Sequence, residues 1–184
     1  MGEMIVRYKE YVNVTSIYCG ENNDIRYCLE VELENCDKTK TALVIMKNPS
    51  KADKKNSDQT VNTVLEVMYK SGYGKCYIMN LIPYYATDSA EIAEKAEEID
   101  EVYFLNDQHL KSRIDNATRI FVAWGGNSSF NIDFYNSRIQ KIKSLLEGKT
   151  VYCYKKNQNG TPIHPSRNQW KKDITDSDFI VYNF

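Results

Sequence analysis

The stretch Ala42–Ser50, Ala-Leu-Val-Ile-Met-Lys-Asn-Pro-Ser, decides the fold. Its first five residues are apolar without alternation, which is typical of a central strand buried on both faces. Pro49 has no amide hydrogen and disfavours helical geometry at Asn48, so we expect the strand to end there. Ligands of open α/β sheets bind just beyond the carboxyl ends of strands. Asn48 and Ser50 therefore lie where a site is expected.

Further apolar runs alternate with segments of helical spacing. Strands are predicted at Lys75–Asn80, Arg119–Ala123 and Thr150–Tyr154. One helix is predicted after a cap at Asp58 or Ser57, with its stop at Ser71-Gly72. Further helices are predicted over Ala90–Ile99, Asn106–Asn116 and Asp133–Leu146. This alternation predicts one α/β domain whose mainly parallel sheet is covered on both faces.

The two ends of the predicted sheet are less regular. Met4–Tyr8 is a candidate first strand, and Arg26–Glu34 alternates apolar and charged residues, as a half-exposed or edge strand does. Residues 1–25 are expected to form a peripheral segment, and residues 168–184 a C-terminal helix or tail. The domain is then residues 1–184.

Composition limits the function classes. The net charge is −1 and the pI about 6.2, which does not indicate attraction of the whole molecule to nucleic acid. No apolar run is long enough to span a membrane and no signal-peptide core is present, so we expect a cytoplasmic protein. The five cysteines form no Cys-x-x-Cys, which favours reduced thiols and predicts no metal site and no cofactor.

Four loops follow the four predicted core strands, and in a parallel sheet these loops meet at one edge. Two of them carry candidate catalytic residues. Asn48 can orient a water molecule or read a base edge, and it is equally consistent with a turn residue before proline. His164 can donate a proton or stabilise a leaving anion, and the alternative is a capping or packing histidine.

The same loops supply candidate binding residues. Tyr84 and Tyr85 offer aromatic faces for stacking on a planar ligand, or they pack in the core. Gly125 lets backbone amides approach a ligand, and Arg167 can clamp a phosphate or form a surface ion pair. The complete set of predicted binding residues is Ser50, Asn80, Tyr84, Tyr85, Trp124, Gly125, Ser166 and Arg167.

Several of these motifs together resemble a known family. Asn48-Pro49-Ser50, Asp58-Gln59-Thr60, Asn80-Leu81, Trp124-Gly125 and His164-Pro165 look like the bacterial and phage domain-of-unknown-function family sixteen-forty-three. The resemblance runs from about Arg26 to Arg167. It implies a shared fold and brings no established activity.

A more remote similarity is to the uracil-DNA glycosylase superfamily, which implies a three-layer α/β/α sandwich with a mainly parallel central sheet. In that superfamily the polar residue of an Asn-Pro or Asp-Pro loop positions the attacking water, and Asn48-Pro49 looks similar. Its late His-Pro-Ser loop touches the base and the DNA backbone, and residues 164–166 match it. Lys47 stands where that superfamily usually has glycine.

Three functions are open at this point. The first is hydrolysis of an N-glycosidic bond on a nucleobase in DNA or in a nucleotide. The second is a non-catalytic module that binds a nucleotide or single-stranded nucleic acid. The third is a protein-interaction domain that uses the acidic stretch Glu91–Glu101, for which the sequence specifies no partner.

Overall fold

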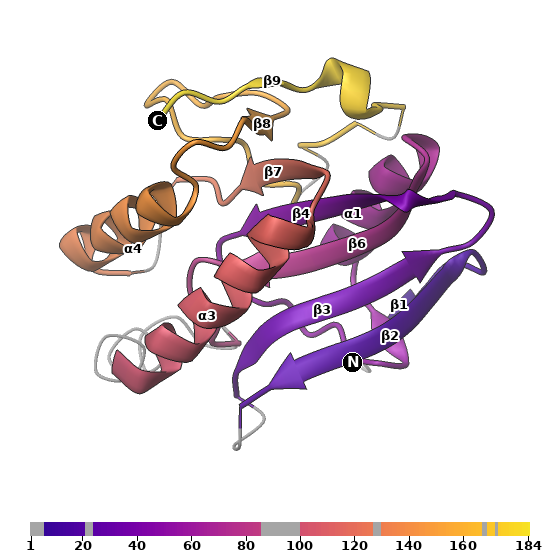
Figure 1. Cartoon of the computed structure of the whole chain (residues 1–184), viewed down its shortest axis with the longest axis horizontal. Helices are drawn as coiled ribbons and strands as arrows, with labels where there is room; N and C mark the ends of the chain where they lie inside the picture. The colour runs from indigo at the N-terminus through magenta and orange to yellow at the C-terminus, as the bar shows by residue number, and fades with distance from the viewer. Residues whose placement is uncertain (1–5, 21–23, 86–99, 127–129, 167–168, 172) are drawn as a thin grey trace, which may run out of the picture.

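The computed structural model describes residues 6–20, 24–85, 100–126, 130–166, 169–171 and 173–184. Its main feature is a seven-stranded mixed sheet, shown in Figure 1. The strand order is β2 (Val12–Cys19), β3 (Arg26–Leu33), β6 (Tyr73–Asn80), β4 (Asp37–Met46), β7 (Arg119–Ala123), β8 (Val151–Cys153) and β9 (Ile180–Val181). The short strands β1 (Val6–Arg7) and β5 (Asn56–Ser57) pair separately.

The centre of the sheet is parallel and its two sides are antiparallel. Strand β4 pairs in parallel with β6 and β7, and β7 does so with β8. The β2–β3, β3–β6 and β8–β9 pairs are antiparallel. The prediction of a mainly parallel sheet is therefore correct only for the four core strands, because β2, β3 and β9 add antiparallel pairs outside them.

Three helices connect or cover the described strands: α1 (Gln59–Lys70), α3 (Asp100–Asn116) and α4 (Ile132–Leu145). Helix α1 begins where the carboxylate of Asp58 accepts hydrogen bonds from the amides of Thr60 and Val61, at 2.8 and 3.0 Å. It ends at Ser71, and Gly72 follows with a φ of +78°. Of the two predicted caps the helix uses Asp58, and the predicted stop at Ser71-Gly72 is confirmed.

Apolar clusters lie on both faces of the sheet. Leu43 and Ile45 of β4 belong to the cluster that α3 and α4 cover, whereas Val44 and Met46 belong to the cluster under α1 and the C-terminal segment. Figure 1 shows α3 and α4 in front of the sheet and α1 behind it. Residues 42–46 are consequently buried throughout, as a central strand requires.

The interpretation of Arg26–Glu34 as an edge strand is wrong. Strand β3 lies between β2 and β6, and most of its side chains are buried. Its Glu30 is accommodated by ion pairs, 3.3 Å from Lys75 and 3.5 Å from Arg113. The edge on this side of the sheet is β2, whose Val-Asn-Val-Thr start alternates apolar and polar residues.

The two chain ends differ in part from expectation. Of the candidate strand Met4–Tyr8, the structure describes only residues 6–8, and Val6–Arg7 form β1. The segment expected as a helix or tail holds a short 3-10 helix, Asp176–Asp178, and the edge strand β9. The predicted helix Ala90–Ile99 lies outside the described residues, as does most of the acidic stretch.

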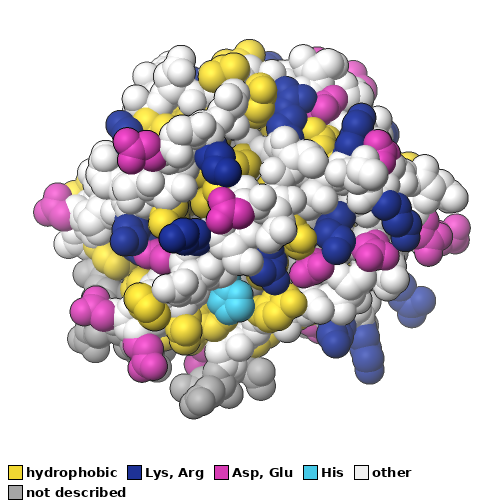
Figure 2. Space-filling view, in the orientation of Figure 1, with side chains coloured by type: hydrophobic (Ala, Val, Ile, Leu, Met, Phe, Trp, Pro, Cys, Tyr) yellow, Lys and Arg dark blue, Asp and Glu magenta, His cyan; other side chains and the backbone are white. Residues whose placement is uncertain are grey.

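The surface carries both signs of charge. On the face shown in Figure 2, basic and acidic side chains are interspersed rather than separated into large fields. Among the described helices, none combines the length and the apolar character that crossing a bilayer would require.

Candidate active site

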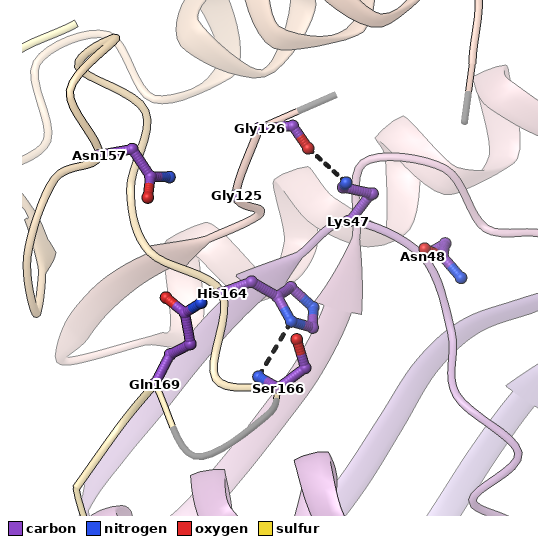
Figure 3. A pocket seen from close by; sticks show the side chains of 8 residues that line it. All are labelled: Lys47, Asn48, Gly125, Gly126, Asn157, His164, Ser166 and Gln169. Carbon is purple, nitrogen blue, oxygen red and sulfur yellow. Dashed lines mark hydrogen bonds between the residues drawn. The ribbon is translucent and has the colours of Figure 1, made fainter. Parts of the chain in front are cut away.

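A cavity of about 350 Å³ opens beyond the carboxyl ends of β4 and β7. Three loops that are far apart in the sequence line it. Figure 3 shows His164 with Lys47 and Asn48 of the β4 loop on one side and Gln169 of its own loop on the other. The lining residues are Lys47, Asn48, Gly125, Gly126, Asn157, His164, Ser166 and Gln169. The predicted convergence of loops thus holds for the segments after β4, β7 and β8.

The loop after β6 fixes the end of β4 without lining this cavity. The amide of Leu81 donates to the carbonyl of Met46 at 2.9 Å, and the amide of Ile82 donates to the carbonyl of Lys47 at 3.0 Å. These bonds continue the parallel ladder one step past the strand. Asn48 therefore leaves the sheet from a defined point, and its Nδ2 donates to the carbonyl of Pro49 at 3.2 Å.

Arg26 supports the same loop from beneath. Its side chain is fully buried, and its Nη1 donates to the carbonyls of Ser50 and Ala52 at 3.3 and 2.9 Å. The guanidinium also lies 5.6 Å from the centre of the Tyr85 ring. A rigid planar donor can hold two carbonyls in this way, so Arg26 fixes the path of the chain directly after Asn48.

His164 is held in one tautomer. Its Nδ1 accepts a hydrogen bond from the amide of Ser166 at 3.1 Å, which assigns the proton of the neutral ring to Nε2. Burial, followed by the nearby charge of Lys47, lowers the pKa of His164 to about 4, with an opposing effect from Asp58. At neutral pH the ring is uncharged and presents an N–H donor.

Gly125 permits the close approach of the β7 loop to the His164 loop. Its φ is +73°, and a Cβ added there would lie 3.1 Å from the Cβ of His164. Its amide donates to the carbonyl of Pro162 at 2.9 Å, and its carbonyl accepts from the hydroxyl of Tyr135 at 3.0 Å. The glycine thus joins two walls of the cavity.

Lys47 is the main residue of the cavity that the sequence analysis did not select. Its Nζ donates to the carbonyl of Gly126 and lies 5.7 Å from the centre of the Tyr135 ring. Burial lowers the pKa of the amine below its ordinary value. Its position in the sequence could have indicated a place in the site, because Lys47 directly follows the buried strand β4. Asn157 and Gln169 lie in the His164 loop, and the sequence analysis did not select them either.

Of the other predicted residues that the structure describes, only Ser166 lines the cavity. Asn80 is fully buried, its amide atoms have no hydrogen-bond partner among the described residues, and its carbonyl accepts from Asn106 at 3.0 Å. Tyr84 is buried in the core near Tyr103, at a ring distance of 6.2 Å.

Trp124 is also a core residue, fully buried against Tyr182 and Phe184. Ser50 and Tyr85 lie beside Arg26 rather than in the cavity wall. Arg167 lies outside the described residues. Tyr84 therefore takes the core-packing alternative rather than the stacking position, because an apolar cluster encloses its ring.

The neutral state of His164 predicts a pH-dependent stability. Its pKa of about 4 in the folded state lies below the unfolded value, so the unfolded chain binds more protons between these values. The free energy of unfolding should fall by about 2–3 kcal/mol from this group as the pH drops from about 6.5 to about 4.5. Urea unfolding near neutral pH and near pH 4.5 measures it, with His164→Gln as the control. Equal losses in wild type and variant would contradict the prediction.

The fold and the cavity define an α/β domain with a small polar site at the carboxyl edge of its parallel strands. A family model described as "Protein of unknown function (DUF1643)" matches residues 26–166, and the chain belongs to this family. The match begins at Arg26 and ends at Ser166, so it includes every residue of the cavity except Gln169. Neither a curated protein nor a solved structure matches the chain.

Proposed function

We propose that the cavity binds a nucleobase or nucleotide and hydrolyses its N-glycosidic bond. The observation that carries this proposal is the presence of Asn48 and His164 in the wall of one cavity. An amide that can position water and a neutral imidazole that can donate a hydrogen bond are the two groups that this reaction needs. The volume of about 350 Å³ lies within the usual range for small-molecule sites.

The chemistry assigns a separate task to each group. A water molecule held by the Asn48 amide attacks C1′ of the sugar, and the bond from C1′ to the base nitrogen breaks with its electron pair moving to the base. The Nε2–H of His164 donates to the base oxygen on which negative charge develops. The proton that the water loses passes to the departing base or to solvent. The remote similarity of the two loops to those of uracil-DNA glycosylases supports this assignment.

A non-catalytic nucleotide-binding site is the second candidate. The described lining contains no Asp or Glu that could act as a general base, and no Phe, Tyr or Trp ring that could stack on a base. It offers hydrogen-bond donors and one lysine, which suit a phosphate or another anionic group. This observation favours binding without turnover.

A base-release assay distinguishes the two candidates. The purified chain is incubated with oligonucleotides that carry uracil, hypoxanthine, mismatched thymine or modified bases, and with the corresponding free nucleotides. Release of a base from one of them, lost in Asn48→Ala, supports hydrolysis. Binding without release, weakened by added salt and by Lys47→Ala, supports the second candidate. If the chain neither released a base nor bound any of these molecules, both candidates would be rejected.

A further inference from the structure

We propose that Lys47 is a nucleophile that forms an imine with the aldehyde of a sugar whose base has departed. This inference rests on the proposed function in one respect, namely that the sugar of the ligand occupies the cavity. It adds a covalent step that hydrolysis by water does not require.

The position of Lys47 supports a role in the site rather than on the surface. Its side chain lines the same cavity as Asn48 and His164, and its Nζ bonds to the carbonyl of Gly126 (Figure 3). The Ile82 amide holds the Lys47 carbonyl at 3.0 Å, which fixes the backbone from which the side chain extends. The amine is thus directed along a wall of the cavity.

Burial shifts the protonation equilibrium of Lys47 toward the uncharged amine. The group is partly buried, and burial lowers its pKa, because desolvation penalises the ammonium form. An amine donates to a carbonyl in either protonation state, so the bond to Gly126 does not require the ammonium form. Lys51, Lys54 and Lys55 of the same loop are exposed to solvent, where water stabilises the ammonium ion. Lys47 is the one lysine in the described lining.

The covalent step balances without an oxidant or reductant. Loss of the base leaves a sugar whose ring-opened form carries an aldehyde at C1′. The lone pair of Nζ attacks this carbon and gives a carbinolamine. The bond from carbon to oxygen then breaks, the oxygen leaves as water with the two hydrogens of the amine, and a C=N bond remains.

Borohydride trapping tests the step directly. The full chain is incubated with an oligonucleotide that contains an abasic deoxyribose, and separately with 2-deoxyribose 5-phosphate. Sodium borohydride then supplies the hydride that reduces the imine to a stable amine. A tetrahydrofuran abasic analogue, which has no aldehyde, is the negative probe. Lys47→Arg retains the charge without the nucleophile, and Lys54→Ala is the matched exposed-lysine control.

We expect a trapped adduct with wild type and with Lys54→Ala, mapped to Lys47 by peptide mass, and at least a tenfold loss in Lys47→Arg. Absence of an adduct with both aldehyde probes, or an adduct spread over surface lysines and unchanged in Lys47→Arg, would overturn the inference. Because these probes need no base release, an adduct on Lys47 without base release would reject the proposed hydrolysis alone. Base release without an adduct would reject the role of Lys47 alone.

Discussion

Replacing His164 with alanine should lower the rate of base release by about 10²–10³-fold, the usual effect of removing one donor from a developing oxyanion. Asn48→Ala should cost a similar factor, because a water molecule without an orienting amide loses its attack geometry. Both effects should appear in kcat, since both groups act on the reacting atoms. Single-turnover assays on the substrate identified by base release measure them.

Conservative variants separate chemistry from folding. Asn48→Asp places a carboxylate where the amide was and can accept the proton of the water, so it should retain more activity than Asn48→Ala. Asn116→Ala is the matched control, because this residue is exposed at the end of α3 and lies outside the cavity. If Asn48→Ala and His164→Ala both kept the wild-type rate, the assigned roles would be wrong.

Local rules predicted the parallel centre of the fold well. The apolar run 42–46, the Asp58 cap and the strand Arg119–Ala123 lie where the sequence placed them, because burial and capping act within a few residues. The antiparallel sides of the sheet were harder to predict from the sequence. Strand β6 enters between β3 and β4, so the position of β3 in the sheet depends on a segment some forty residues away. The charged residues that alternate with apolar ones along β3 include Glu30, which forms ion pairs, so the alternation does not indicate an exposed face.

In the candidate site, too, some features were predictable from the sequence and others were not. The rule that loops meet at the carboxyl edge of parallel strands placed Asn48, Gly125 and His164 together correctly. It could not say which side chains turn into the core. Trp124 precedes Gly125 by one residue and is fully buried, whereas Gly125 faces the cavity. Arg26, which supports the Asn48 loop, belongs to β3. The sequence predicts an edge strand there, so it does not indicate a buried supporting role for this side chain.

The structure also contains a buried ion pair whose removal should cost more stability than any exposed pair. Arg138 of α4 is 6% exposed, and its Nη2 and Nη1 lie 2.6 and 3.2 Å from the carboxylate oxygens of Asp107 on α3. Its Nε donates to the carbonyl of Leu81 at 3.1 Å, and the guanidinium lies 4.5 Å from the centre of the Tyr103 ring. One side chain thus joins two helices to the loop after β6.

Arg138→Ala should lower the free energy of unfolding by about 3–5 kcal/mol, because it leaves the Asp107 carboxylate, whose side chain is only 13% exposed, without its partner. Urea unfolding measures this loss. Lys149→Ala is the matched control: Lys149 lies 3.4 Å from Asp115, the two side chains are 42% and 62% exposed, and we expect a cost below about 1 kcal/mol. Similar losses in the two variants would contradict the prediction.

A compensated variant tests the cause of that loss. In Arg138→Met with Asp107→Leu, apolar side chains replace both charges, and most of the stability should return because no charge remains buried alone. The bond from Arg138 to the Leu81 carbonyl is still absent in this variant. Leu81 also donates to Met46 at the end of β4, so any remaining loss of activity would measure how far Arg138 positions the Asn48 loop. Full activity in the compensated variant would limit Arg138 to stabilising the fold.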